Sequence, residues 1–410
     1  MDEMRYAVGL DVGTDNVRAV ILSVNKEGVK TVVGYAEAKN AGMRKGLVSN
    51  LSGPGEAIDR MLGEAERMSG YEVNSAHVSI NGKHIISTPT EGMIAVGTVD
   101  HEIDEEDLAR VEDVAVSGRI PANRDVLDVV PLEFAIDGQG GVKDPIGMTG
   151  SRLEMRATVI SALTPNCDNL KKATESANVY AERLVPSVVA SARAVLEEHQ
   201  MENGVAVVDF GAATTSIAIF EEGDLQYVSV IPAGSNNVTN DLAIMLGIDT
   251  KTADDLKCKH VTGMIGSKEK PISMKVDNDM VEFERRQIDE VVQIRLKEIF
   301  EHVQKEIKAA HYEKRLPEGI VLTGGGTKMK DLDKFVKLEL GCSVKVGVPR
   351  GIVGGVVDAV SKPEYAAAVG LALIATDNEE KVAAGRKGFK PKLKTKSNGK
   401  GFWAKIFGRK

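Results

Sequence analysis

Two segments of this chain share an uncommon pattern, and their repetition constrains the fold more than any other feature. Residues 7–22 (AVGLDVGTDNVRAVIL) and residues 205–220 (VAVVDFGAATTSIAIF) each contain an apolar run, a turn that opens with Asp-x-Gly, and a second apolar run. Each continues through a polar turn into a third strand pattern. Strand, tight turn, strand, turn and strand predict an antiparallel meander, and its recurrence predicts two halves of related architecture.

The sequence between the two repeats has a different character. It contains short β patterns and one acidic helical pattern, from Glu105 to Val116, which together indicate an inserted α+β subdomain. The expected divisions are a first half, 1–72 and 166–200; an inserted subdomain, 73–165; and a second half, 201–375, with a smaller subdomain around 248–312. The fold class expected is therefore α/β, in two halves with an insertion in the first.

The C-terminal region is set apart by its charge. Residues 381–410 contain eleven Lys or Arg and no Asp or Glu, so the rest of the chain carries −19 against a total of −8. An acidic body repels nucleic-acid phosphates, which argues against a nucleic-acid partner and favours attachment to an anionic surface. Residues 376–400 show no periodicity, and we expect them to form a flexible basic linker.

The last ten residues, 401–410, predict an amphipathic helix that lies on a membrane. Its apolar side chains, Phe402, Trp403, Ile406 and Phe407, would lie on one face of the helix, and the basic Lys405 would flank that face. A large apolar face with basic edges is typical of an interfacial helix. The alternative is a helix that docks on its own protein or on a partner.

The remaining composition points to the cytoplasm. The chain is 42% hydrophobic, enough for a buried core. No stretch approaches the ~18–20 apolar residues of a membrane-spanning helix, and the acidic N-terminus does not predict a secretory signal. The three cysteines have no metal-ligand or disulfide spacing, which favours a reducing compartment.

The two Asp-x-Gly turns carry the residue types that a bound triphosphate requires. Glycine lets backbone N–H groups approach phosphate closely, and carboxylates hold Mg²⁺, commonly through water. Asp11 and Asp209 are the candidate Mg²⁺ residues, one in each half. The alternative is that each turn is only a hairpin connection, but the pairing of the motifs favours ATP and Mg²⁺ as ligands.

Several longer motifs resemble one family in particular. They are NAGMRKGLV (40–48), NSAHVSINGKHI (74–85), DGQGGVKDPIGMTGSRLEM (137–155), ASARAVL (190–196), IPAGSNNVTNDLAIMLG (231–247), GIVLTGGGTKMKDL (319–332) and the tail GFWAKIFGRK. This set resembles the FtsA family of bacterial cell-division proteins, within the superfamily of actin, sugar kinases and heat-shock chaperones. The resemblance implies an actin-like two-domain ATPase fold and covers nearly the whole chain.

The resemblance also implies roles for individual residues. A first phosphate loop would contain Asp11, Gly13 and Thr14, and a second would contain Gly211, Thr214 and Thr215, with Asp209 as the Mg²⁺-water carboxylate. Asp254 and Lys257 would hold the ribose and base, and Gly234 would lie beside the phosphates. Gly324, Gly325 and Gly326 would lie against the adenosine. Ala212, Ala213 and Ser235 replace family glycines, and Ser187 replaces a carboxylate. These departures predict that ATP binds and that hydrolysis is slow or absent.

Family membership implies a cell-division adaptor at the cytoplasmic face of the membrane, at the septum. Such an adaptor tethers filaments of the partner FtsZ through their C-terminal tail and assembles into filaments of its own, with the insertion at the contact between copies. Arg285, Arg286 and Arg295 are candidate contacts for the FtsZ tail. Two alternatives stay open: a pilus-assembly scaffold of the same fold, and a small-molecule kinase of the same superfamily.

Overall fold

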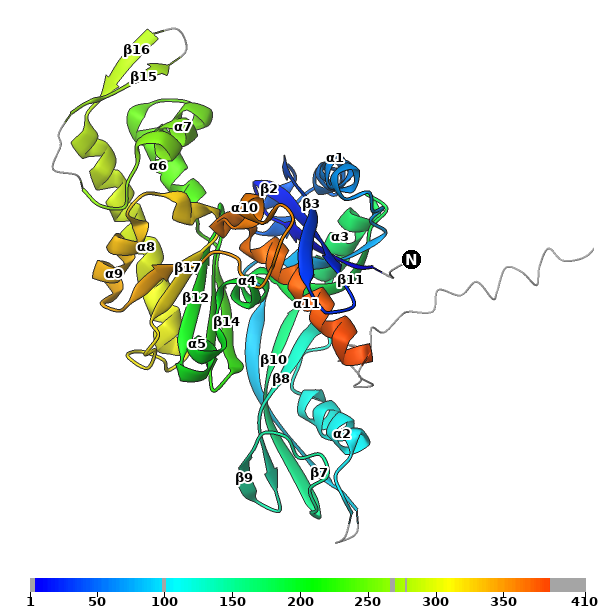
Figure 1. Ribbon diagram of the computed structural model, residues 1–410. Helices are drawn as coiled ribbons and strands as arrows, with labels where there is room; N and C mark the ends of the chain where they lie inside the picture. The colour runs from blue at the N-terminus through cyan, green and yellow to red at the C-terminus, as the bar shows by residue number, and fades with distance from the viewer. Residues whose placement is uncertain (1–3, 98–100, 266–269, 277–278, 384–410) are drawn as a thin grey trace, which may run out of the picture.

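The computed structural model describes residues 4–97, 101–265, 270–276 and 279–383 (Figure 1). Its framework is a pair of five-stranded sheets, one in each half. In order across the sheet, the first contains β11 (Tyr180–Pro186), β6 (Ser75–Ile80), β1 (Arg5–Val12), β2 (Asn16–Val24) and β3 (Lys30–Lys39). The second contains β18 (Val344–Val346), β17 (Ile320–Thr323), β12 (Val205–Phe210), β13 (Thr215–Glu221) and β14 (Asp224–Ile231).

The two sheets have the same topology. In each, three consecutive strands form an antiparallel meander, and two later strands add in parallel beside the first strand of that meander. The central strands are apolar because both of their faces are covered; β12, for example, is buried at five of its six positions. The prediction of two related halves is confirmed.

Two helices, α4 (Ser187–Val195) and α11 (Ala366–Ala383), pack against each other near the junction of the halves. Small residues allow this close packing. A Cβ added at Gly370 of α11 would overlap the carbonyl oxygen of Ala190 in α4, and one at Gly9 of β1 would overlap that of Ala368. The helix α11 therefore lies directly on the first sheet, although it follows the second half in the chain.

The inserted subdomain is a four-stranded antiparallel sheet covered by one helix, and it projects away from the rest of the molecule (Figure 1). Its elements are β7 (Ile86–Ala95), α2 (Glu105–Val116), β8 (Arg124–Ile136), β9 (Gln139–Val142) and β10 (Arg152–Leu163). We expected the insertion to begin at residue 73, which is one strand too early. β6 pairs with β1 and β11 and so belongs to the first sheet.

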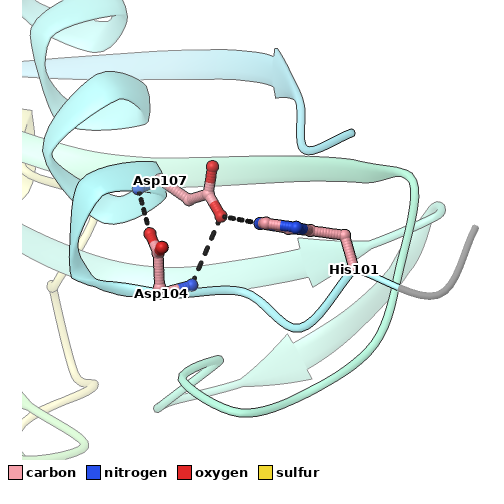
Figure 2. Close-up of side chains that lie close together, drawn as sticks. All are labelled: His101, Asp104 and Asp107. Atoms are coloured by element: carbon pink, nitrogen blue, oxygen red, sulfur yellow. Dashed lines mark hydrogen bonds and ion pairs between the residues drawn. The ribbon is translucent and has the colours of Figure 1, made fainter. Parts of the chain in front are cut away.

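The start of α2 is fixed by a capping box, drawn in Figure 2. The Asp104 carboxylate accepts hydrogen bonds from the backbone N–H groups of Glu106 and Asp107. In return, the Asp107 carboxylate accepts from the N–H of Asp104 and bonds the His101 ring at 3.2 Å. These contacts satisfy backbone donors that the first turn of a helix otherwise leaves unpaired.

The other elements complete the two halves. They are β4 (Met43–Arg44), β5 (Leu47–Val48), α1 (Ser52–Ser69), α3 (Thr164–Glu175), α5 (Glu198–Asn203), α6 (Ser235–Leu246), α7 (Thr250–His260), β15 (Ile272–Val276), β16 (Asp279–Phe283), α8 (Arg285–Ala309), α9 (Leu332–Leu340), α10 (Val357–Val360) and two short 3₁₀ turns, η1 (Gly325–Lys328) and η2 (Pro363–Tyr365). The long helix α8 is amphipathic: Ile288, Val292, Leu296, Ile299, Val303 and Ile307 are buried at helical spacing.

Two boundaries near the C-terminus differ from expectation. The second half was expected to extend to residue 375, but α11, which begins at Ala366, packs against β1, β2 and β6 of the first sheet. The expected linker begins at 376, whereas α11 continues to Ala383. The predicted membrane helix, 401–410, lies outside the described residues. Within the described part of the chain, no helix combines the length and apolarity needed to cross a bilayer.

Candidate functional site

A cleft of about 380 Å³ lies between the β1–β2 hairpin of the first half and the β12–β13 hairpin of the second. Residues far apart in the sequence meet there. The predicted site residues that line it are Asp11, Gly13, Thr14, Asp209, Gly211, Thr214, Asp254, Lys257, Gly324, Gly325 and Gly326. The predictions of a first loop, a second loop and a late Gly-rich loop therefore converge on one cavity.

The first hairpin places Asp11 at the end of β1, where a hydroxyl holds it. Ser79 Oγ, on the neighbouring strand β6, donates to Asp11 Oδ1 at 2.7 Å and accepts from the Val12 N–H at 2.8 Å. In the turn that follows, a Cβ at Gly13 would crowd the Asn16 carbonyl oxygen. The glycine is needed because the turn folds back closely on itself.

The second hairpin repeats this arrangement with Asp209. Ser191 Oγ, on α4, donates to Asp209 Oδ2 at 2.8 Å. The third loop adds a contact that the first hairpin lacks: Gly324 has φ of +88°, and a Cβ there would overlap Asp209 Oδ1. Only glycine allows this loop to approach the carboxylate in that backbone conformation.

The pKa values of both carboxyls are raised above their ordinary value. Burial raises the pKa of Asp209 to about 6; the Ser191 hydrogen bond lowers it, nearby Asp11 raises it further, and Arg18 lowers it. Burial also raises the pKa of Asp11, with partial relief from Arg18 and the Ser79 hydroxyl. Asp11 thus disfavours the ionisation of Asp209, and such a pair of carboxyls forms a site that a cation would stabilise.

Sequence reasoning missed Arg18, which lines the cleft and influences both carboxyls. In the hairpin register Asp11 lies opposite Arg18, so the two side chains point to the same face of the sheet. Arg18 Nε donates to Glu37 at 2.8 Å, and its guanidinium lies over the Tyr365 ring. Counting pairs back from the turn between β1 and β2 would have identified this cation.

Hydrogen bonds cross the cleft from one half to the other. At one point the Asn81 amide of the first half donates to Thr214 Oγ1 at 3.1 Å and accepts from Ser216 Oγ at 3.1 Å. At another, Asn236 Nδ2 donates to Asp15 Oδ1 at 2.9 Å. These hydrogen bonds were not predicted, because the motif at 74–85 was interpreted without giving Asn81 a role.

The predicted ribose- and base-binding pair lies in one wall of the cleft. Lys257 Nζ pairs with Asp254 Oδ1 at 2.7 Å and donates to Thr239 Oγ1 at 2.7 Å. The lysine is thus held nearly buried, and its ammonium is positioned by two partners from α6 and α7. Cys258 lines the same wall, an additional residue that the motif did not identify.

Two predicted site residues do not line the cavity. Thr215 is fully buried, and its hydroxyl donates to the Ala233 carbonyl at 2.8 Å. Gly234 lies at the start of α6, where a Cβ would crowd the carbonyl oxygens of Gly211 and Ala212. Thr215 and Gly234 therefore stabilise the second loop through contacts outside the cavity, and we propose a structural role for both.

The cleft residues fit the group that the fold implies. Ser187, at the position of the missing carboxylate, lines the cavity with a buried Oγ that has no hydrogen-bond partner within the described part of the chain. Asp11, Asp209 and Arg18 supply the charges that Mg²⁺ and phosphate require. The one other described cluster of metal-ligating types, His101, Asp104 and Asp107, is engaged in the α2 cap (Figure 2).

Comparisons with known families agree with this geometry. Residues 206–370 match the family model described as "Cell division protein FtsA", and residues 82–161 match "SHS2 domain inserted in FTSA". The chain is 36% identical to the cell division protein FtsA of Pseudomonas aeruginosa over 371 residues, which is 90% of this chain and 88% of that protein. The chain belongs to the FtsA family.

A second sequence relative supports the family assignment, and two solved structures identify the fold. FtsA of Escherichia coli K12 is 31% identical, with 90% of each chain covered. Two solved structures share the architecture: the PilM-PilN type IV pilus biogenesis complex (TM-score 0.66, 17% identity, 90% of this chain and 98% of that one) and MreB5 of Spiroplasma citri bound to ADP (TM-score 0.58, 12% identity, 93% and 98%). The actin-like fold with an insertion in its first half is confirmed.

The three arginines expected to bind a partner differ in their availability. Arg295 Nη2 pairs with Asp241 at 3.0 Å, and Arg295 also contacts Glu298. Arg285 pairs with buried Asp289. Arg286 is 79% exposed and has only a neighbouring Glu290 on α8, so it is the one of the three best placed to meet another molecule.

Proposed function

We propose that this member of the FtsA family is an ATP-binding adaptor that tethers FtsZ filaments to the cytoplasmic face of the cell membrane at the division septum. The observation that carries the nucleotide part is the convergence of three predicted loops, two partly buried carboxylates and Arg18 on one cleft. The adaptor part rests on family membership and on the aromatic-basic sequence at 402–407.

The cleft residues divide the binding of Mg-ATP between them. Asp209 and Asp11 would hold Mg²⁺, mainly through water, and the turns that begin at Gly13 and Gly211 would offer backbone N–H groups to phosphate. Arg18 would pair with phosphate oxygens, and Lys257 with Asp254 would hold the ribose and base. Titration calorimetry with the full chain tests this assignment: saturable Mg-ATP binding is expected, and its absence contradicts it.

Hydrolysis should be slow. Ser187 stands where chaperone relatives carry a carboxylate that orients the attacking water, and a hydroxyl is a much weaker base. We expect phosphate release far below the ~10 s⁻¹ of an ordinary enzyme. A turnover near that value would contradict this part of the proposal and revive the kinase alternative.

The proposed binding surface for the FtsZ tail lies on α6 and α8. Ile244 on α6 is 82% exposed and Ile294 on α8 is 70% exposed, and the Arg295–Asp241 pair joins these two helices. Arg286 and Ile294 are eight residues apart, which places them on one face of α8. An acidic, apolar peptide would find both apolar and cationic contacts there.

Substitution can test this surface. Ile294→Glu should weaken binding of an FtsZ tail peptide by about tenfold or more, because it removes an apolar side chain whose burial by the peptide would contribute ~1.5–3 kcal/mol. Arg286→Glu should have a smaller, salt-dependent effect. Lys345→Glu, an exposed charge reversal on β18, is the control. Equal binding by all three variants would remove the surface from the proposal.

Attachment to the membrane is proposed for residues 402–407, namely Phe402, Trp403, Lys405, Ile406 and Phe407. One such helix should bind weakly and depend on anionic lipid, because ordering a ten-residue segment offsets most of the gain from burying its apolar side chains. Assembly would then make attachment stable through many tails on one filament. Trp403→Glu should abolish co-sedimentation with anionic liposomes and leave ATP affinity unchanged.

Self-assembly into filaments is proposed to use the inserted subdomain. Glu105, exposed at the start of α2, is a suitable position for charge reversal. Asp107 is unsuitable, since it is buried and caps α2. Glu105→Lys should impair polymerisation on lipid and spare ATP binding, as the subdomain contributes neither phosphate loop. The shared fold of PilM-PilN leaves the pilus-scaffold alternative open on fold alone, but the family match favours cell division.

A further inference from the structure

The inserted subdomain is rooted in the first half but makes polar contacts to the second. The chain enters it after β6 and leaves it into α3, both in the first half. Yet it meets β14, the edge strand of the second sheet. Ser87 Oγ on β7 accepts from the Val228 N–H at 3.0 Å and donates to the Val228 carbonyl at 3.2 Å. Thr158 Oγ1 on β10 donates to the Gln226 carbonyl at 3.3 Å.

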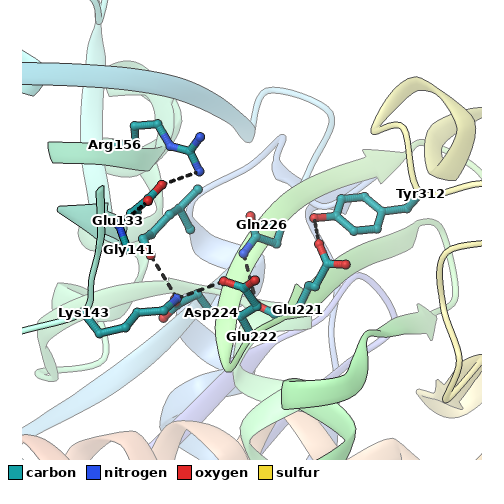
Figure 3. Close-up of polar contacts among 10 residues, drawn as sticks. Glu133, Gly141, Lys143, Arg156, Glu221, Glu222, Asp224, Gln226 and Tyr312 are labelled. Atoms are coloured by element: carbon teal, nitrogen blue, oxygen red, sulfur yellow. Dashed lines mark hydrogen bonds and ion pairs between the residues drawn. The ribbon is translucent and has the colours of Figure 1, made fainter. Parts of the chain in front are cut away.

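A lysine adds an ionic contact between the same two parts, shown in Figure 3. Lys143 Nζ lies 2.8 Å from Asp224 Oδ2 and 3.3 Å from Glu222 Oε2, both at the β13–β14 turn. It also donates to the Leu132 carbonyl of β8 at 3.0 Å, which fixes its direction. Lys143 belongs to the GVKDPIG sequence, for which the proposed function gives no role. We call these contacts of Ser87, Thr158 and Lys143 the insertion bridge.

Both ends of the insertion bridge connect to the cleft through short segments of chain. On the second half, β13 runs from Thr215, beside the phosphate loop, to Glu221, next to the Lys143 contact. On the first half, the turn between β6 and β7 joins Asn81, in the cleft, to Ser87, in the bridge, six positions later. A ladder of hydrogen bonds holds β13, and the Ile85 N–H bond to the Gly82 carbonyl closes the turn between β6 and β7, so either route can transmit a displacement.

The cleft and the bridge thus join the same two bodies at two places. At the cleft, the joining bonds are those of Asn81 with Thr214 and of Asn236 with Asp15. A triphosphate seated between the hairpins contacts the same loops and must replace or tighten those bonds. Any resulting change in the angle between the halves also acts on the bridge.

We propose that the insertion bridge and the nucleotide stabilise the same arrangement of the two halves, so that the bridge senses nucleotide occupancy and sets the orientation of the inserted subdomain. This inference rests on the proposed binding of Mg-ATP in the cleft. Because coupling of this kind is reciprocal, breaking the bridge must weaken nucleotide binding by the same factor by which nucleotide strengthens the bridge. The subdomain proposed to contact a neighbouring copy would then be held in place more firmly when nucleotide is bound.

The first test measures Mg-ATP affinity of the full chain by titration calorimetry. The double variant Ser87→Ala, Lys143→Glu should bind Mg-ATP at least about fivefold more weakly than the unmodified chain. Adding Asp224→Lys to Lys143→Glu should recover part of the affinity by restoring an opposite-charge pair. Lys334→Ala removes a comparably exposed lysine, paired with Asp331 outside the bridge, and should leave the affinity unchanged.

The second test follows amide hydrogen exchange in the peptide that contains Val228. Mg-ATP should slow its exchange in the unmodified chain and in Lys334→Ala, and this protection should vanish in the double variant. Equal affinities in all variants, or exchange at Val228 that ignores Mg-ATP, would overturn the coupling alone. Failure of the unmodified chain to bind Mg-ATP would overturn the proposed function and this inference together.

Discussion

The β1–β2 and β12–β13 hairpins are built alike and charged differently. Each ends its first strand near an Asp, turns through four residues, and holds that Asp with a serine hydroxyl from a neighbouring element. Opposite Asp11 in the register stands Arg18, whereas opposite Asp209 stands Ser216. The first hairpin therefore supplies a cation to the cleft, and the second supplies a carboxylate with no cation paired to it in the register.

This difference indicates that the two similar hairpins bind different parts of the ligand. A phosphate is attracted to the hairpin that carries Arg18, and a metal ion to the hairpin that carries Asp209, which has no cation opposite it in the register. Backbone topology made both loops, but single side chains decide what each can hold. Four experiments can break or sharpen this contrast.

The largest effect is expected from Asp209→Asn, which removes the carboxylate proposed to hold Mg²⁺. Mg²⁺-dependent ATP affinity should fall by about 10–100-fold, the range found when groups that support a metal ion are lost. Asp11→Asn should cost less, since Arg18 remains opposite that position. Calorimetry with and without Mg²⁺ measures both. Equal losses in the two variants would mean that the hairpins share the metal evenly.

Arg18→Ala should weaken ATP binding about tenfold, from the loss of a charge-assisted hydrogen bond of ~1.5 kcal/mol. The effect should persist without Mg²⁺, because Arg18 is assigned to phosphate. Arg156→Ala, which removes an arginine paired with Glu133 in the insertion, is the matched control. If Arg18→Ala changes only the Mg²⁺ requirement, the arginine acts on the carboxylates instead.

The two serines should differ in their effect on stability. Ser79→Ala leaves the buried Val12 N–H without its acceptor, which costs about 1–3 kcal/mol of unfolding free energy. Ser191→Ala removes one hydrogen bond to Asp209 and should cost about 1 kcal/mol. Urea unfolding of both variants measures the difference. The opposite order would show that the second hairpin depends more on its serine than the first.

The smallest expected effect is a pH dependence set by Asp209. Its pKa is raised to about 6, so Mg²⁺ must bind in competition with a proton below that pH. Mg²⁺ affinity should rise about fourfold from pH 5.5 to 7 and then level. Without Mg²⁺ the sign reverses for stability: the folded state holds this proton more tightly than the unfolded state, so unfolding free energy falls as pH rises from about 4 to 6. Asp209→Asn should flatten both profiles.

Much of the site followed from local sequence. The two Asp-x-Gly turns and the Gly324–Gly326 loop were identified from residue type and spacing, whereas the Asp254–Lys257 pair came from the resemblance to the FtsA family; all of them line the cleft. Arg18 was within reach as well, since a four-residue turn fixes which residues of a hairpin lie opposite each other. Sequence reasoning stopped at the turn and did not follow the register into β2.

The errors arose where distant segments pair. β6 was assigned to the insertion because its six residues resemble the strands that follow, but it pairs in parallel with β1 across more than sixty residues of chain. The helix α11 was divided between the second half and a linker because its sequence reveals no partner. Its alanines and Gly370 lie against α4 and β1, a match of shapes that appears only when those elements meet.

The sequence by itself determined the two hairpins, their phosphate-type loops, the presence of an insertion and the basic, aromatic tail, because turns and strand alternation depend on neighbours a few residues apart. The tertiary structure decided that Asp11 and Asp209 face one cleft and that the insertion contacts β14. It also placed Ser79, Ser191 and Asn81 where their hydrogen bonds stabilise the residues that line the cleft. Contacts between the halves join residues as far apart in the chain as Asp15 and Asn236, which are 221 positions apart. They are selected by burial and packing of the whole molecule, which no local pattern encodes.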